Sequence, residues 1–196
     1  MTDLLLKQFE VTRGSNTIVR NHTTVTNSPP NSYNVGNHVG GCVQTLLLCF
    51  PRASTALIRW MAFHDYSEYE TGDIVGSAKV KHPTLGKVVK EIEDKIEEEY
   101  QILVGYDLTE LEKIVVDYVD RAELLLWCFE QYEMGCRTKR FLNMMKRVDQ
   151  KVLQLKNEFV DERPLQPSAY EMHLHDGVVR LSQVVAARYR EANVQL

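Results

Sequence analysis

The stretch TKRFLNMMKRVDQKVLQLKNEF, residues 138–159, decides the fold class of this chain. Its large apolar residues recur at intervals of four, three, four, three and four: Phe141, Met145, Val148, Val152, Leu155 and Phe159. Because an α-helix has 3.6 residues per turn, residues at this spacing lie along one face of a helix. The sequence predicts a helix that packs along this seam. We expect the seam to be core; the alternative is a surface for a partner helix or for a second copy of the chain.

Helical patterns continue on both sides of the seam. The further expected helices span residues 38–50, 54–70, 87–103, 107–133 and 168–192. Ser54 and Asp107 are of the types that cap helix N-termini, so we expect them to open two of these helices. In the strongly charged helix 87–103, Val88, Ile92 and Ile96 form one apolar stripe, which predicts a surface helix.

The segment before these helices has a different composition. Residues 12–37 are rich in Asn, Thr, Ser and Pro, which favour turns and extended backbone over helix. No alternating strand pattern of useful length and no internal repeat is present. We therefore expect an all-α fold with a single domain over residues 1–196. In it, residues 12–37 form an irregular loop on the substrate side, and residues 138–196 form C-terminal packing helices.

The bulk composition narrows the function classes. Of the 196 residues, 44% are hydrophobic and 26% are charged, which is ordinary for a globular protein and sufficient for a full-sized core. The formal net charge of −4 argues against coating a nucleic acid polymer, which requires a basic face. The N-terminal apolar run is too short for a signal peptide or a membrane span, so we expect no membrane partner.

The cysteines are expected to be reduced. Cys42, Cys49, Cys128 and Cys136 include no CxxC pair, and the first two lie seven residues apart in an apolar helical pattern. Four buried free thiols are typical of a reducing compartment. We therefore expect a cytoplasmic protein.

One turn of the chain is unusually rich in titratable groups. HDYSEYETGD, residues 64–73, follows an apolar helical segment, and on a helix His64, Asp65 and Glu68 would share one face. Carboxylates at this spacing repel each other, and a cation beside them would offset the repulsion. An imidazole with carboxylates suits Zn, Co, Mn, Fe or Mg. The alternative is an ordinary solvated helix end. A second His-Asp pair, His175-Asp176, has no such following acids, and we expect Asp176 to be a turn or capping residue.

The residues after the first His-Asp pair resemble the signature of the HD-domain metal-dependent phosphohydrolases. More narrowly, they resemble the branch of bacterial 5′-deoxynucleotidases and phage dATP triphosphohydrolases. The matching positions are His64, Asp65, Ser67, Glu68, Thr71, Gly72, Asp73 and Lys79. Two more elements occur in the order that the family has: NVGNH, which ends at His38, and an aspartate in an apolar helix, Asp120. Arg20-Asn21-His22-Thr23 is similar to an R-x-H-T phrase of the phage members.

The resemblance implies an HD-domain helical bundle and assigns roles to these residues. The metal ligands would be His38, His64, Asp65 and Asp120. An unpaired carboxylate would be costly in the apolar surroundings of Asp120, which supports its assignment. Its alternatives are an ion pair with Arg121 and the rival ligand Asp117. The resemblance also allows a second metal ion near Glu68 and Asp73.

The remaining roles implied by the resemblance concern chemistry and substrate. The catalytic residues would be Glu68, which positions or activates water, and Asp73, which acts as general acid or helps at the second metal. The substrate-binding residues would be Arg20, Lys79, His22 and Thr23. The first two suit phosphate oxygens, and the others would line the base or sugar pocket.

The chain departs from the family pattern at several positions. Asn37 and Val39 flank His38 where a glutamate and a serine are usual, so the affinity or choice of metal is expected to differ. Asn21 replaces a tryptophan that reads deoxyribose in many members. Asp117 replaces a lysine that is common three residues before the last metal ligand, so the polyphosphate would be held differently or only one phosphate handled.

Three functions follow as expectations. The first is hydrolysis of a nucleotide phosphate ester, as a phage dATP triphosphohydrolase that releases deoxyadenosine and triphosphate in the host cytoplasm. The second is a 5′-deoxynucleotidase that acts on deoxynucleoside monophosphates. The third is a non-catalytic helical interaction protein. Members of the family form oligomers, so the resemblance implies a homo-oligomer.

Overall fold

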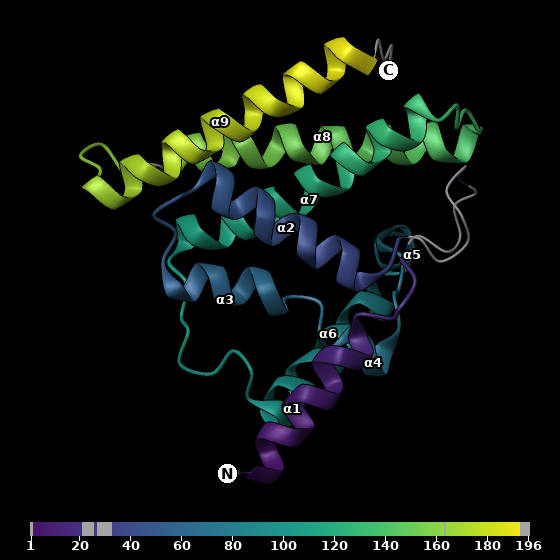
Figure 1. Ribbon diagram of the computed structural model, residues 1–196, viewed down its shortest axis with the longest axis vertical. Helices are drawn as coiled ribbons and strands as arrows, with labels where there is room; N and C mark the ends of the chain where they lie inside the picture. Colours follow the sequence, from purple (N-terminus) through teal and green to yellow (C-terminus); the bar gives the residue numbers. More distant parts are fainter. Residues whose placement is uncertain (1, 21–25, 27–32, 163, 193–196) are drawn as a thin grey trace.

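A computed structural model describes residues 2–20, 26, 33–162 and 164–192 of the chain (Figure 1). Within these residues the structure is built of α-helices, and the β-structure there is an isolated antiparallel bridge between Val19 and Asn34. The predicted all-α fold is confirmed. No helix in the described part of the chain has both the length and the hydrophobicity needed to cross a membrane.

Helix α7 (Glu110–Glu133) is the axis around which the larger part of the molecule packs. Its N-terminus carries a capping box, in which the Thr109 side chain and the Glu112 backbone and side chain bond reciprocally. The predicted start at Asp107 is therefore wrong by a few residues, because the threonine provides the cap. Residues on most sides of α7 are buried, so neighbouring helices surround it.

Four helices pack against α7. They are α2 (Val35–Cys49), α3 (Thr55–Phe63), α8 (Lys139–Asp161) and α9 (Ala169–Ala192). In Figure 1, α8 and α9 lie above α7, α3 lies below it, and α2 crosses it. Ser54 caps α3 as expected, because its side chain accepts a hydrogen bond from the backbone N–H of Leu57.

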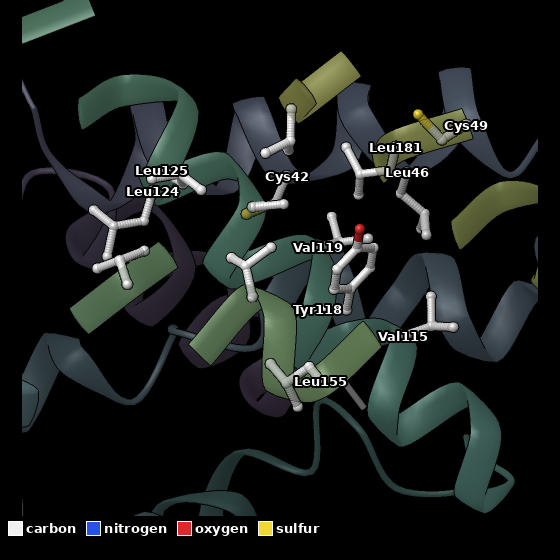
Figure 2. Packing of buried hydrophobic residues seen from close by; sticks show 14 of the residues in the cluster. Cys42, Leu46, Cys49, Val115, Tyr118, Val119, Leu124, Leu125, Leu155 and Leu181 are labelled. Atoms are coloured by element: carbon white, nitrogen blue, oxygen red, sulfur yellow. The ribbon is translucent and has the colours of Figure 1, made fainter. Parts of the chain in front are cut away.

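The predicted seam on α8 is confirmed as part of the core. Phe141, Met145, Val148, Val152, Leu155 and Phe159 are all buried. Figure 2 shows Leu155 of this seam together with core residues of α2, α7 and α9, among them Leu46, Leu125 and Leu181. Each fully buried side chain of this size contributes about 1.5–3 kcal/mol by leaving water. The four cysteines are free and buried, as expected from their spacing.

A smaller group of helices lies at one end of this core: α1 (Thr2–Ser15), α4 (Glu68–Thr71), α5 (Gly76–Lys81) and α6 (Pro83–Tyr100). Its own apolar cluster is small and consists of Val11, Tyr66, Ile96, Ile102 and Leu103. Helix α1 contacts α4 and α6. The chain segment between α3 and α4 therefore lies where the two groups of helices meet.

Helix α1 reduces the extent of the expected N-terminal loop. The prediction of loop over residues 12–37 is wrong at both ends, because α1 continues to Ser15 and α2 begins at Val35. Asn34 caps α2, and its side chain accepts a hydrogen bond from the backbone N–H of Asn37. The Asn in NVGNH therefore starts the helix that carries His38.

The apolar stripe of α6 differs from the predicted one. Val89 and Ile96 are buried, whereas Val88 and Ile92 are 45% and 39% exposed. Adjacent valines leave the phase of the stripe ambiguous, and the buried face is the one that carries Val89 and Ile96, of which Ile96 belongs to the smaller cluster. The helix also begins earlier than predicted, at Pro83, whose fixed backbone angle suits the first turn.

The predicted helix over residues 54–70 is wrong, because it is broken at His64. Helix α3 ends at Phe63, residues 64–67 form a turn, and α4 follows. In a continuous helix, the backbone N–H of Asp65 would bond to the carbonyl of Met61. Here the His64 ring lies 3.0 Å from that carbonyl through its Nδ1 and satisfies it.

The second His-Asp pair is helical, so the expectation that Asp176 is a turn or capping residue is wrong. His175 and Asp176 lie inside α9, and the side chain of Asp176 is 70% exposed. Gly177 serves packing rather than a turn. A Cβ atom at Gly177 would stand 2.1 Å from the ring of the buried Phe50.

Candidate metal centre

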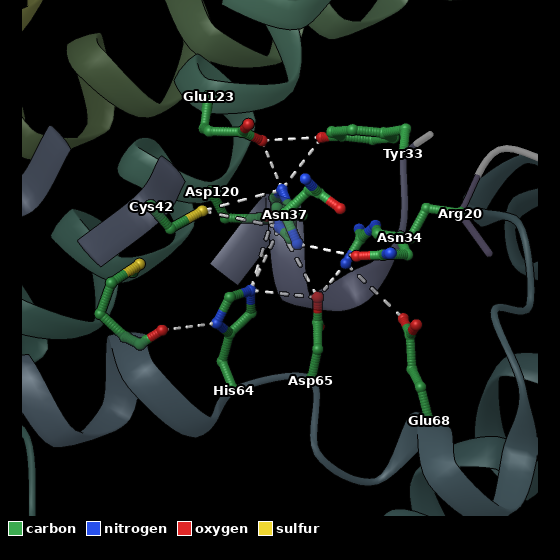
Figure 3. A network of polar contacts seen from close by, with 12 residues as sticks. Arg20, Tyr33, Asn34, Asn37, Cys42, His64, Asp65, Glu68, Asp120 and Glu123 are labelled. Carbon is green, nitrogen blue, oxygen red and sulfur yellow. Dashed lines mark hydrogen bonds and ion pairs between the residues drawn. The ribbon is translucent and has the colours of Figure 1, made fainter. Parts of the chain in front are cut away.

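Three helices bring four polar side chains together at the junction of the two helix groups (Figure 3). His38 lies in the first turn of α2, His64 ends α3, and Asp65 is the next residue in the turn. Asp120 lies in the middle of α7. These four residues, far apart in sequence, are the ligands that the family resemblance implies.

The distances between their ligand atoms are short. His38 Nε2 lies 3.3 Å from His64 Nε2 and 2.8 Å from Asp120 Oδ1. Asp65 Oδ2 lies 3.2 Å from His64 Nε2 and 3.6 Å from His38 Nε2. Ligand atoms at about 2.0–2.3 Å from a tetrahedral zinc ion stand about 3.3–3.8 Å from one another. The spacing of these atoms is therefore close to that of a coordination shell.

Both histidines turn the same ring nitrogen toward the cluster. His64 Nδ1 faces the carbonyl oxygen of Met61, and His38 Nδ1 faces the Glu123 carboxylate. Since both partners accept hydrogen bonds, a proton on each Nδ1 would leave the Nε2 lone pair of each ring free for a metal ion. Two such lone pairs 3.3 Å apart suit a shared cation.

Glu123 and Tyr33 form a support for His38 that the sequence reasoning missed. The Glu123 carboxylate contacts His38 Nδ1 and accepts a hydrogen bond of 2.7 Å from the Tyr33 hydroxyl. Figure 3 shows Glu123 and Tyr33 together, on the side of the cluster away from His64. A carboxylate at the outer nitrogen of a metal-binding histidine fixes its orientation and raises its basicity.

A signal for Glu123 was present in the sequence. It follows Asp120 by three residues in a predicted helix, and residues at this spacing share one helix face. Gly41 on α2 makes room for it, because a Cβ atom there would stand 2.8 Å from Glu123 Oε1.

One ligand atom lacks a hydrogen bond. Asp120 is 8% exposed, and its Oδ1 is buried without a hydrogen bond of good geometry among the described residues. Its other oxygen lies 3.4 Å from Arg121 Nε, so the ion pair considered as an alternative role exists beside the histidine contact. A cation among the histidines would satisfy the remaining oxygen.

Cys42 also belongs to this cluster. His38, Cys42, His64 and Asp120 offer ligand atoms that all lie within 4.8 Å of one another, so this group could hold a metal ion. Asp117, the rival to Asp120, is exposed and is not in the group. The residues present therefore fit a divalent cation with nitrogen, oxygen and sulfur ligands.

The electrostatics of the cluster keep one histidine neutral. Burial lowers the pKa of His64 to about 4, although nearby Asp120 opposes the shift. Burial would also lower the pKa of His38, but its contacts with Asp120 and Glu123 outweigh burial and raise it. Burial would raise the pKa of Asp120, but Arg121 and His38 lower it, so the carboxylate is charged.

Arg20 lies across the acidic side of the cluster. Its guanidinium bonds to Asp65 and lies 3.8 Å from Glu68 Oε1, and only 10% of the side chain is exposed. Arg20 Nε and Glu68 Oε2 are buried without hydrogen-bond partners in the described part of the chain. Burial raises the pKa of Glu68, and Asp73 adds to the shift while Arg20 opposes it.

The other predicted substrate and catalytic residues lie farther out. Lys79 Nζ pairs with Glu93 at 3.5 Å, and its side chain is 38% exposed. Asp73 is half-buried after α4 and influences Glu68 through its charge. His22 and Thr23 lie outside the described residues.

Comparisons with known proteins do not identify a family. The chain matches no protein-family model, no curated protein and no solved structure.

Proposed function

We propose that this chain is a metal-dependent hydrolase of deoxynucleotide phosphate esters. One observation carries the proposal: His38, His64 and Asp120, from three helices, direct ligand atoms at one point beside Asp65. The HD-type signature in the sequence supports it, because the residues that converge are those that the signature implies.

The chain's own residues supply the proton chemistry. A divalent cation bound there would make hydroxide available near neutral pH and withdraw charge from a phosphoryl oxygen. Glu68 Oε2, buried and without a hydrogen-bond partner among the described residues, would orient the attacking water and accept its proton. Asp73 would donate a proton to the leaving oxygen.

The phosphate would be bound by Arg20, with help from Lys79. The Arg20 guanidinium is buried beside the acidic cluster, and its Nε has no partner in the described structure, so one donor is available to a phosphate oxygen.

Within this class we favour the reaction of a dATP triphosphohydrolase, which releases deoxyadenosine and triphosphate. The Arg20-Asn21-His22-Thr23 phrase and the short chain support that choice. A 5′-deoxynucleotidase would instead release orthophosphate from monophosphates. The products distinguish the two.

The remaining alternative was a non-catalytic interaction protein that uses the α8 seam. That seam is buried against the chain's own helices, so it offers no free face to a partner. The α8 seam therefore no longer supports the interaction-protein alternative.

The test is a nucleotide panel with added Mn, Co, Zn or Mg. We expect the native protein to hydrolyse one or more deoxynucleotides. His64→Ala should lose metal and activity together. Glu68→Ala should retain metal and lose about 10²–10⁴-fold in kcat, the usual contribution of a general base. His175→Ala, in the other His-Asp pair, is the matched control and should behave as the native protein.

Two results would refute this function. One is the absence of hydrolysis of every nucleotide with every metal. The other is native-rate turnover by both His64→Ala and Glu68→Ala.

A further inference from the structure

The cluster contains a thiol that the HD-type signature does not include. Cys42 follows His38 by one turn on α2, and its side chain is fully buried. Its Sγ lies 3.6 Å from His38 Nε2. Figure 3 shows the thiol on the same side of the picture as His64 and close to Asp120.

The distance suits coordination of a shared ion. With Zn–N at about 2.0–2.1 Å and Zn–S at about 2.3 Å, a sulfur and a nitrogen on one tetrahedral ion stand about 3.6 Å apart. The separation between Cys42 Sγ and His38 Nε2 equals this value. The Nε2 atoms of the two histidines lie 3.3 Å apart, which also fits.

A second observation points to an ion at the same place. Asp120 is more than nine-tenths buried, and its Oδ1 has no hydrogen bond of good geometry in the described structure. That oxygen, the Cys42 sulfur and the two Nε2 atoms form the group whose members all lie within 4.8 Å. The thiol therefore shares its surroundings with the site's unsatisfied carboxylate oxygen.

We propose that Cys42 is a further ligand of the metal and that its thiolate makes the site selective for zinc or cobalt over magnesium and manganese. Thiolates prefer softer ions, whereas a shell of carboxylates and water suits the harder ones. Coordination replaces the thiol proton, which leaves to solvent. This inference rests on the metal site of the proposed function and deepens it by specifying the class of metal.

The chain contains a matched control for Cys42. Cys49 lies two turns farther along α2 and is also buried and free, but it is not in the metal-binding group. Replacing either residue by serine changes one sulfur atom to oxygen on the same helix. A general effect on packing would appear in both variants, whereas an effect on coordination would appear only at Cys42.

The test is optical absorption of the full-length protein loaded with cobalt(II). A thiolate bound to cobalt gives an intense charge-transfer band in the near ultraviolet, which nitrogen and oxygen ligands do not give. We expect the band in the native protein and in Cys49→Ser, and its loss in Cys42→Ser. Cobalt bound to the native protein without this band would overturn the proposal, and that result does not depend on any variant folding.

A competition titration measures the selectivity. Cys42→Ser should lower zinc affinity by about 100-fold or more. Removing a residue that only supports a ligand already costs up to about 100-fold, and removing a ligand should cost at least as much. Its magnesium affinity should stay within about threefold of native. Equal losses for both metals would overturn the selectivity claim.

The outcome is separable from that of the proposed function. Nucleotide hydrolysis without the charge-transfer band removes Cys42 from the ligand set and leaves the proposed function standing. The band without hydrolysis of any nucleotide supports the thiolate and refutes the proposed function.

Discussion

At the scale of single residues, the site depends on which nitrogen of each histidine carries the proton. The Met61 carbonyl sets this for His64, and the Glu123 carboxylate sets it for His38. Glu123 is in turn held by the Tyr33 hydroxyl, whose ring stacks on Trp127 with centroids 4.3 Å apart. The orientation of His38 is thus fixed from α7 through a carboxylate that would not touch the metal.

Replacing Glu123 should weaken metal binding without removing a ligand. Glu123→Ala should lower affinity by about 10–100-fold, since the imidazole loses the partner that orients it and raises its basicity. Glu123→Gln keeps an oxygen that can accept the proton of His38 Nδ1, so its loss should be smaller. Titration with zinc or cobalt measures both.

The control for this position is Glu130→Ala, an exposed glutamate two turns farther along α7. It should bind metal as the native protein does. Native affinity in Glu123→Ala would show that the carboxylate has no positioning role.

At the scale of elements, α2 brings His38 and Cys42 to the site and lets α7 approach closely. Its two adjacent glycines differ in their surroundings. A Cβ atom at Gly40 would meet nothing within 4 Å, whereas one at Gly41 would press on the Glu123 side chain. Replacing Gly40 by alanine therefore tests helix propensity alone, whereas replacing Gly41 also disturbs Glu123 at the site.

Gly40→Ala should stabilise the protein by about 0.5–1 kcal/mol, because glycine costs that much inside a helix. Gly41→Ala should gain less, because Glu123 must move, and that movement should lower metal affinity by about tenfold through the loss of support for His38. Thermal unfolding and metal titration of both variants check this. Equal metal affinity in both would refute the role of Gly41.

The N-terminus of α7 should make stability depend on pH. Although Glu112 is buried, hydrogen bonds from Ser54, Thr109 and Tyr170 lower its pKa below the usual 4.5. A group with a lowered folded-state pKa contributes its stability above the unfolded pKa and loses it as pH falls through the folded value. This contribution should therefore be complete at pH 6 and should decline below about pH 4.5.

Glu112→Gln should cost about 1–3 kcal/mol at neutral pH, because an amide nitrogen would face donors that now meet a charged oxygen. It should also flatten the decline in stability toward acid. Urea unfolding at several pH values measures both effects. Glu110→Gln, on the same first turn with its side chain 80% exposed, is the control and should change stability little. An unchanged acid decline in Glu112→Gln would contradict the assignment.

The helices show how far local sequence patterns reach. The seam of α8 and the N-cap of α3 follow from spacing and residue type alone, and the structure agrees with both. The break at His64 was missed because it depends on a side chain that satisfies the Met61 carbonyl. The stripe of α6 was misassigned because two adjacent valines fit either phase, and only the folded structure shows that Val89 is the buried one.

Some residues of the site could be predicted from the sequence motif, and others are identified only in the folded structure. His38, His64, Asp65 and Asp120 were found because the motif fixes their identities, and the structure brings them together. Glu123 lies one turn after Asp120 and Cys42 one turn after His38, so helical spacing places each on the face of a predicted ligand. Their contacts with the ring of His38 appear only once α2 lies against α7.

At the scale of the whole molecule, the cluster lies where the larger core meets the smaller group of helices. His38 and Asp120 come from the larger core, His64 ends a helix of that core, and Glu68 begins the smaller group. A cation bound here would stabilise the folded state by mass action. The central claim is that one ion occupies this junction.

Diffraction at the cobalt absorption edge, from crystals of cobalt-loaded protein, tests this claim most directly. We expect one anomalous peak about 2.0–2.3 Å from Nε2 of His38, Nε2 of His64 and Oδ1 of Asp120. Cobalt-loaded crystals in which the two histidine rings remain in contact, with no peak between them, would contradict the account.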